Sequence, residues 1–209
     1  MIKRIVLVIV AVAFMVNIGS TQDLRGTFYF GPKIGLNLAN VYDSEGEEFD
    51  ADPKVGLAAG IFFAIPIGTL LGVQPELLFS QKGFQASGSV LGNDYTFTRT
   101  LNYIDVPLLV SVKPTPMITL LVGPQYSYLV SKTDVFSSSL LTVEQEEEFE
   151  NDNIRKNTLC FLGGIDINVS SFVFGARVGW DLLQNVGDGT STTPRYKNVW
   201  YQATVGFRL

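Results

Sequence analysis

Residues 71–83 read LGVQPELLFSQKG, and apolar and polar side chains alternate along them. One alternate set is Leu71, Val73, Pro75, Leu77 and Phe79. The other is Gly72, Gln74, Glu76, Leu78, Ser80 and Lys82. Because successive side chains of a strand point to opposite faces of a sheet, the pattern predicts a β-strand with one apolar and one largely polar face. Such a strand suits a soluble sandwich, whose apolar face meets a second sheet, or an outer-membrane barrel, whose apolar face meets lipid.

The composition of the 209-residue chain favours the membrane alternative. Only 17% of the residues are charged, whereas about 25% are charged in a typical soluble domain. Hydrophobic residues make up 46% of the chain. Beyond the N-terminal segment, no window reaches the ~18 apolar residues that a transmembrane helix needs. An apolar chain without such a window is typical of a membrane β-barrel.

The N-terminal segment has the pattern of a secretory signal peptide. Lys3 and Arg4 precede an apolar run over residues 5–16, and small or polar residues follow. The run is too short for a spanning helix. We therefore expect residues 1–21 to be a signal peptide and residues 22–209 to form one barrel domain, the alternative being a retained N-terminal anchor.

Eight segments repeat the alternation of residues 71–83. They are residues 28–40, 55–65, 71–83, 95–112, 118–130, 158–169, 172–182 and 198–209. Their connections alternate between long and short, as in outer-membrane barrels, where periplasmic turns are short and external loops are long. The pattern predicts an all-β fold, an eight-stranded antiparallel up-and-down transmembrane β-barrel in the outer membrane with both termini periplasmic.

A soluble lipocalin-like binding barrel is the alternative fold. Its apolar side chains would point inward to form a core, and its loops would have no reason to be long at one end only. Here the second face of each strand is rich in glycine and charge, which suits a narrow polar lumen.

Four motifs occur in order along the predicted strands. They are GPKIGLNLANV (residues 31–41), VQPELLFSQKG (73–83), YIDVPLLV (103–110) and FGARVGWDLLQNV (174–186). With them the chain resembles the PorT-like outer-membrane β-barrel family of the Bacteroidota, which shares the architecture of small OmpA/OmpX-type barrels. It departs from the family at Asp105, where glutamate is frequent, and at Leu209, where an aromatic residue is frequent. The resemblance implies fold and location but little about activity, although one namesake is tied to protein secretion.

The predicted inward faces carry charges of both signs. We expect five in the lower half of the lumen: Lys33, Glu76, Asp105, Asp166 and Arg177. Three more should lie higher: Lys82, Arg99 and Asp181. Because side chains just fill the interior of an eight-stranded barrel, we predict a structural salt-bridge plug, with Glu76 and Asp105 pairing with Lys33 and Arg177. The alternative is a proton or ion path along the same residues.

The longest connection, residues 131–156, carries an acidic cluster. Its members are Glu144, Glu146, Glu147, Glu148, Glu150 and Asp152. Their spacing does not match an EF-hand, so we expect a solvated external loop, with a short helix as a further expectation. The alternative is a divalent-cation site that bridges to lipopolysaccharide phosphates.

The sequence predicts a protein that is not an enzyme and holds no cofactor or metal. The chain has no histidine, which excludes Ser-His-Asp and related schemes because they need an imidazole to shuttle the proton. A carboxylate-only mechanism remains, but the sequence identifies no paired carboxylates at an exposed cleft. The single cysteine, Cys160, has no partner within the chain for a disulfide and is expected to be buried.

Charge and topology together suggest the partners. A net charge of −5 without a basic patch argues against nucleic acid. The expected partners are membrane lipid and lipopolysaccharide, with envelope proteins as candidates at the external loops. The expected function is therefore a structural or interaction role. Its alternatives are a component of outer-membrane transport or protein secretion, and a soluble binding barrel.

Overall fold

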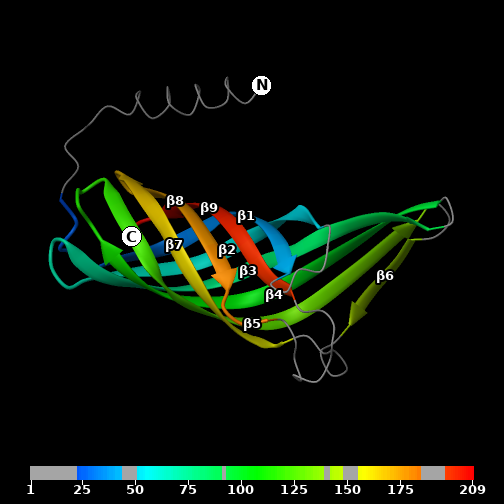
Figure 1. Cartoon of the computed structure of the whole chain (residues 1–209). Coiled ribbons are helices and arrows are strands. Elements are labelled where there is room, and N and C mark those ends of the chain that lie inside the picture. Colours follow the sequence, from blue (N-terminus) through cyan, green and yellow to red (C-terminus); the bar gives the residue numbers. More distant parts are fainter. Residues whose placement is uncertain (1–22, 44–50, 91–92, 139–141, 148–154, 185–195) are drawn as a thin grey trace.

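The computed structural model describes residues 23–43, 51–90, 93–138, 142–147, 155–184 and 196–209. These residues form one elongated barrel (Figure 1). The predicted signal peptide, residues 1–21, lies outside the described residues, and so does most of the connection between the predicted strands at residues 172–182 and 198–209.

Nine strands occur in the described part of the chain. They are β1 (Tyr29–Asp43), β2 (Asp52–Pro66), β3 (Leu71–Val90), β4 (Asn93–Val112), β5 (Ile118–Ser138), β6 (Thr142–Glu147), β7 (Asn157–Val169), β8 (Phe172–Asp181) and β9 (Tyr196–Phe207). Antiparallel pairing runs through β4-β3-β2-β1-β9-β8-β7-β5, and the pairing of β4 with β5 closes the ring. The ring has eight strands, while β6 pairs with β5 outside it. The predicted eight-stranded up-and-down barrel is confirmed.

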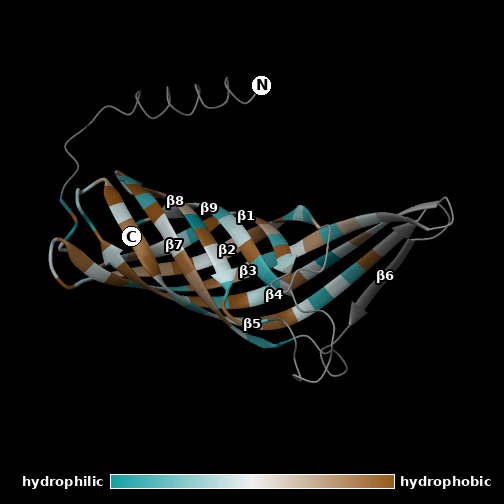
Figure 2. Ribbon diagram, viewed as in Figure 1, coloured by the Kyte–Doolittle hydropathy of each residue, from teal (hydrophilic) through white to brown (hydrophobic). Residues whose placement is uncertain are grey.

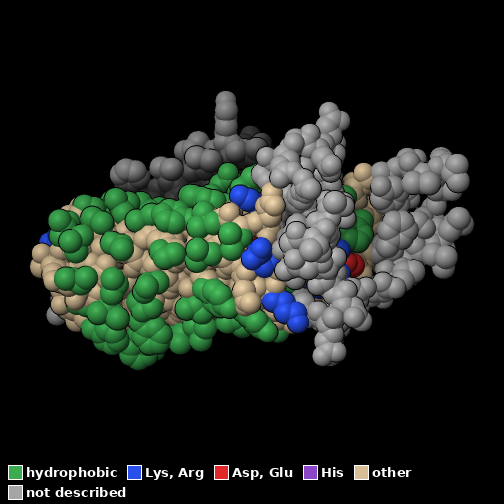
Figure 3. Space-filling view, turned by 60° about the horizontal axis from the view of Figure 1, so that its bottom comes forward, with side chains coloured by type: hydrophobic (Ala, Val, Ile, Leu, Met, Phe, Trp, Pro, Cys, Tyr) green, Lys and Arg blue, Asp and Glu red, His purple; other side chains and the backbone are tan. Residues whose placement is uncertain are grey.

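The apolar face of each strand points away from the lumen. On β1, Ile34 is 63% exposed and Leu36 is 53% exposed, whereas Lys33 is 4% exposed and Asn37 is fully buried. Hydrophobic side chains cover much of the face of the barrel shown in Figure 3, and apolar and polar residues alternate along the strands (Figure 2). Exposed large hydrophobic residues occur on all eight strands of the ring and form an apolar belt. A continuous apolar surface of this size suits lipid, because soluble monomers rarely expose patches beyond a few hundred Å².

The lumen holds many polar and charged side chains beside apolar ones such as Leu109, Leu162 and Trp200. The buried set includes Lys33, Asn37, Gln74, Glu76, Lys82, Asp105, Asp166, Arg177 and Asp181. A lipocalin has an apolar interior and a polar outer face, whereas this barrel buries charges and exposes its apolar faces, so the alternative of a soluble lipocalin-like barrel is wrong.

Strands β3 and β5 run further than the sequence pattern predicts. β3 ends at Val90 and β5 at Ser138, beyond the expected ends at residues 83 and 130. Gly83 lies within β3 with φ +143°, a conformation that residues with side chains rarely adopt, and a Cβ there would clash with the carbonyl oxygen of Arg99. The glycine- and serine-rich residues beyond it resemble a loop in sequence, but their backbone stays paired with β4 up to Val90 and Asn93.

The long predicted connection at residues 131–156 also contains strand. β5 continues to Ser138 and residues 142–147 form β6, so the expected short helix is wrong for the described part of this segment. The backbone of Glu144, Glu146 and Glu147 lies on β6. The remaining acidic cluster members, residues 148, 150 and 152, lie outside the described residues. Among the residues described, no helix is long and apolar enough to cross a membrane.

Candidate functional site

The larger group of buried charges in the lumen joins four strands. Glu76 of β3 meets Lys33 of β1 at 2.9 Å and Arg177 of β8 at 3.1 Å. Arg177 also meets Asp166 of β7 at 3.1 Å. Gln74 donates hydrogen bonds to Glu76 at 2.9 Å and to Asp166 at 3.3 Å. We call Lys33, Gln74, Glu76, Asp166 and Arg177 the lower network.

The lower network is enclosed and electrically balanced. None of its charged residues is more than 4% exposed, and its two cations meet two carboxylates. Burial of each charge alone would cost several kcal/mol by the general estimate for ions in proteins, and pairing offsets that cost. The Arg177 guanidinium contacts both carboxylates, which its planar set of donors allows. The Lys33 ammonium also lies 5.2 Å from the centre of the Phe62 ring.

The contact between Glu76 and Arg177 crosses the lumen. Around the closed ring, β2, β1 and β9 lie between β3 and β8 on one side, and β4, β5 and β7 lie between them on the other. The two strands therefore form opposite walls. A direct ion pair therefore spans the lumen between them at this point.

A second group of buried charges surrounds Lys82. Its ammonium meets Asp105 of β4 at 3.0 Å. The ammonium also lies 3.7 Å from the ring centre of Trp200 and 4.8 Å from that of Tyr103, so it makes cation–π contacts with both rings. Lys82, Trp200 and Tyr103 are each 1% exposed. We call Lys82, Tyr103, Asp105 and Trp200 the upper network.

The prediction that Asp105 pairs with Lys33 and Arg177 is wrong. Leu71 pairs with Val112 in the β3–β4 ladder, and Asp105 lies opposite Leu78. Asp105 is therefore two positions further from the short turn than Glu76, or about 7 Å along the strand. That offset places its carboxylate beside Lys82. Asp166, by contrast, lies in the lower network, where the sequence places it.

Asp181 and Cys160 form a third polar contact in the lumen. The Cys160 thiol donates to the Asp181 carboxylate at 3.1 Å, and the backbone N–H of Asn198 donates to the same carboxylate at 3.1 Å. Ser127 lies 3.4 Å from the Cys160 sulfur. Cys160 is fully buried. It is therefore enclosed and hydrogen-bonded rather than presented to a substrate.

The end of the barrel away from the short turns holds a charge group of which the sequence predicted only one member, Arg99. Arg99 of β4 meets Asp134 of β5 at 2.7 Å, and Lys132 meets the same carboxylate at 3.1 Å. The two β5 residues fall in a segment that reads as a loop, so the sequence offered no face on which to place them. The alternation of charge along SKTD is compatible with a strand and was the available signal.

The described residues offer little for catalysis or metal binding. Among them, no group of three or more Cys, Asp or Glu side chains is arranged to hold a metal ion. Each carboxylate of the lower and upper networks forms an ion pair with a lysine or arginine side chain in the lumen. These ion pairs connect different strands of the barrel.

Comparison with protein family models agrees with this fold. The family model described as "Outer membrane protein beta-barrel domain" matches residues 20–185. No curated protein matches the sequence. Similar solved structures include the attachment invasion locus protein Ail of Yersinia pestis, with 14% identity and a TM-score of 0.45, covering 87% of this chain and 98% of Ail.

Two further solved structures show similar coverage. Neisserial surface protein A has 12% identity and a TM-score of 0.46, covering 86% of this chain and 97% of its own. OprG of Pseudomonas aeruginosa has 12% identity and a TM-score of 0.41, covering 87% of this chain and 95% of its own.

Proposed function

We propose, because the chain belongs to the outer membrane protein beta-barrel domain family, that it acts as a non-enzymatic interaction barrel of the outer membrane. Its location in the outer membrane follows from that family and from the outward apolar belt. The interaction role, a closed lumen and the identity of the partners are the proposed part.

The ion pair between Glu76 and Arg177 carries the proposal of a closed lumen. It joins opposite walls at 3.1 Å, and Lys33 on β1 and Asp166 on β7 extend it to two further strands. Above it, Lys82 is held between Asp105 and Trp200. Steady diffusion of solutes through such an interior would require both networks to break, so we assign these charges to closure rather than to conduction.

The external end is the proposed interaction surface. Strands β3, β4 and β5 continue beyond the apolar belt, and β6 adds a further strand there (Figure 1). Expected partners are lipopolysaccharide and membrane lipid around the belt, and envelope proteins at the extended strands and loops. The backbone of Glu144, Glu146 and Glu147 lies on β6 at this end, and we propose that the acidic cluster is solvated.

Topology and lineage complete the proposal. We infer a cleaved signal peptide over residues 1–21 and a periplasmic location for both termini, from the leader pattern and the short turns beside β2–β3, β4–β5 and β7–β8. Within the wider family, the YIDVPLLV and VQPELLFSQKG motifs support a PorT-like barrel of the Bacteroidota.

Planar-bilayer recording of the purified barrel tests the closed lumen against the transport alternative. We expect no large, steady conductance from the native protein. Large and steady pores would contradict the proposal and favour a role in transport.

Crosslinking in intact envelopes tests the interaction role. Photoreactive residues are placed at Thr98, on the part of β4 beyond the apolar belt, and at Thr69, in a short turn. Capture from position 98 alone is expected, whereas capture from neither position would count against it.

A further inference from the structure

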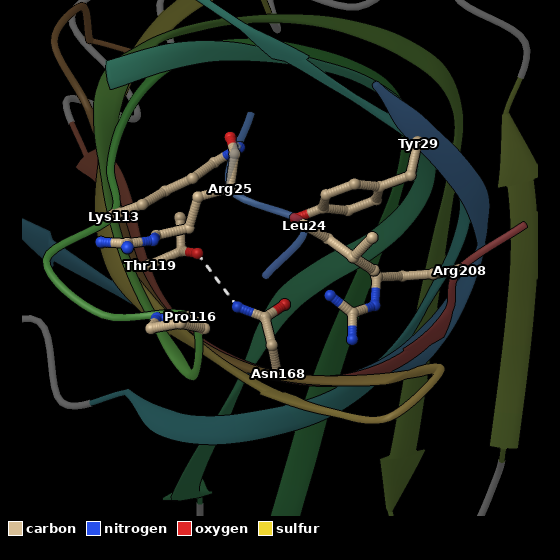
Figure 4. A pocket seen from close by; sticks show the side chains of 8 residues that line it. All are labelled: Leu24, Arg25, Tyr29, Lys113, Pro116, Thr119, Asn168 and Arg208. Atoms are coloured by element: carbon tan, nitrogen blue, oxygen red, sulfur yellow. Dashed lines mark hydrogen bonds between the residues drawn. The ribbon is translucent and has the colours of Figure 1, made fainter. Parts of the chain in front are cut away.

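The mouth of the barrel at the short-turn end is lined by three cationic residues. Arg25, Lys113 and Arg208 surround a small cavity together with Leu24, Tyr29, Pro116, Thr119 and Asn168 (Figure 4). The N-terminal segment at Leu24 and Arg25 runs across this mouth, and Lys113 follows β4 while Arg208 follows β9. The cationic side chains thus come from three separate parts of the chain.

Two of these cations have no carboxylate partner in the part of the chain that the structure describes. Lys113 is only 2% exposed, and its ammonium donates to the backbone carbonyl of Arg25 at 3.1 Å. Arg208 donates through Nη2 to the carbonyl of Ser170, but its buried Nε has no hydrogen-bond partner. No carboxylate among the described residues forms an ion pair with either side chain. Arg25 differs, because it pairs with Asp23 at 2.8 Å.

Lys113 and Arg208 also share one aromatic ring. The Lys113 ammonium lies 5.5 Å from the ring centre of Tyr29, and the Arg208 guanidinium lies 5.3 Å from it. Burial, and secondly the positive charge of Arg208, lower the pKa of the Lys113 ammonium below its ordinary value. Two like charges held against one ring are therefore an arrangement that an anion would stabilise.

We propose that this mouth binds a phosphate group, free or carried by a lipid head group. The enclosed space is about 10 Å³, which is room for about one water. One phosphate oxygen fits between Lys113 and Arg208, and the remainder of the group lies at the opening. The two uncompensated positive charges match a phosphate, which carries one to two negative charges, better than a single carboxylate. Arginine and lysine are the usual ligands for phosphate oxygens.

Titration with inorganic phosphate tests the site in the full barrel, refolded in octyl glucoside micelles, which contain no phosphate. Saturable broadening of the ³¹P resonance is expected with the native chain. Lys113→Gln and Arg208→Gln should each raise the Kd at least about tenfold, because each removes a charge-assisted hydrogen bond. Lys113→Arg keeps the charge and should retain most of the affinity.

A matched control removes a cation from the opposite end. Lys197 lies on β9 opposite Tyr42, far along the strand from Arg208. Lys197→Gln should therefore leave the Kd for phosphate unchanged. Heat-modifiable gel mobility verifies that each variant is folded. A native barrel without saturable binding, or binding that survives both Lys113→Gln and Arg208→Gln, would overturn the site.

Short-chain phosphatidic acid, titrated in the same micelles, distinguishes the two sources of phosphate. Competition by inorganic phosphate for the bound lipid is expected if the site reads only the phosphate group. Lipid binding that phosphate cannot displace, but that Lys113→Gln abolishes, would assign the site to a lipid head group.

Discussion

Glu76 on β3 and Arg177 on β8 join opposite walls of the barrel through a contact of 3.1 Å. Neither strand hydrogen-bonds the other, since three strands lie between them in each direction. The pair therefore stabilises the closed cross-section through side chains alone. Both residues are nearly inaccessible to solvent, so each depends on the other and on Lys33 and Asp166 for its compensation.

Removal of the Arg177 charge should destabilise the barrel strongly. Arg177→Leu leaves Glu76 with Lys33 alone and deprives Asp166 of its cation. We expect a loss of about 3–5 kcal/mol in the free energy of unfolding where the site is dry, and less where water enters the lumen. Urea unfolding of the barrel from lipid vesicles, followed by tryptophan fluorescence, measures it.

A double-mutant cycle provides the control for this loss. Glu76→Leu combined with Arg177→Leu should reduce the free energy of unfolding by less than the sum of the two single changes. The second change removes a charge that the first has already left without its ion-pair partner. Strict additivity would show that the two side chains do not interact.

The lower and upper networks should behave independently of each other. Glu76→Gln perturbs Lys33 and Arg177, while Asp105→Asn perturbs Lys82, and no ion pair is shared between the two sets. Their effects on the free energy of unfolding should add to within about 0.5 kcal/mol. A coupling well above that value would mean that the networks form one unit, and equilibrium unfolding of the two single variants and the double variant decides it.

The direction in which a side chain points was predictable from the sequence, whereas its height was not. Strict alternation along residues 71–83 places Glu76 and Lys82 in the lumen, and burial of both agrees. Height depends on how neighbouring strands are offset, which a single strand does not encode. Asp105 shows this, since two residues of offset along the β3–β4 ladder move it from the lower network to Lys82.

The length of the strands was not predictable from the sequence either. Residues 84–90 contain serine and glycine, which favour loops in isolation. In the barrel their backbone groups pair with β4, and Phe84 packs against Phe97 with ring centres 6.1 Å apart. The mouth site was missed for a related reason. Lys113 lies just beyond the alternating segment 95–112 and Arg208 lies near the end of the segment 198–209, and the two meet only through closure of the ring.

Gly179 should tolerate no side chain, because the Trp200 ring lies directly over it. A Cβ at this position would clash with the six-membered ring of Trp200. That ring cannot yield freely, since Lys82 lies 3.7 Å from its centre. Gly179→Ala should therefore cost about 1–3 kcal/mol through overpacking, measured by equilibrium unfolding. Gly163→Ala on β7 is the matched control, because a Cβ there meets nothing within 4 Å; equal losses at the two positions would contradict the steric cause.

Cys160 should resist thiol reagents while the barrel is folded. Its side chain is fully buried and donates to Asp181, so neither access nor a thiolate is available. Maleimide labelling, followed by mass spectrometry, should be at least about tenfold slower for the folded protein than for the urea-unfolded chain, because reaction requires opening of the barrel. The chain has a single cysteine, so all label reports this site. Similar rates in both states would show that the lumen is open to reagents at this depth.

A charge placed on the outer face should cost most at the middle of the apolar belt. Leu36 on β1 is 53% exposed and lies six residues from both Phe30 and Tyr42, whose rings are also exposed. Six residues span about 20 Å of strand, or about 15 Å of height at a typical tilt. Leu36→Arg should therefore reduce the free energy of unfolding from lipid vesicles by about 2–4 kcal/mol, whereas Tyr42→Arg near the external boundary should cost about 0–1 kcal/mol from its charge. Both variants place arginine on the same face of the same strand, so the difference isolates depth in the bilayer. Equal costs at the two positions would mean that the belt is not where lipid surrounds the protein.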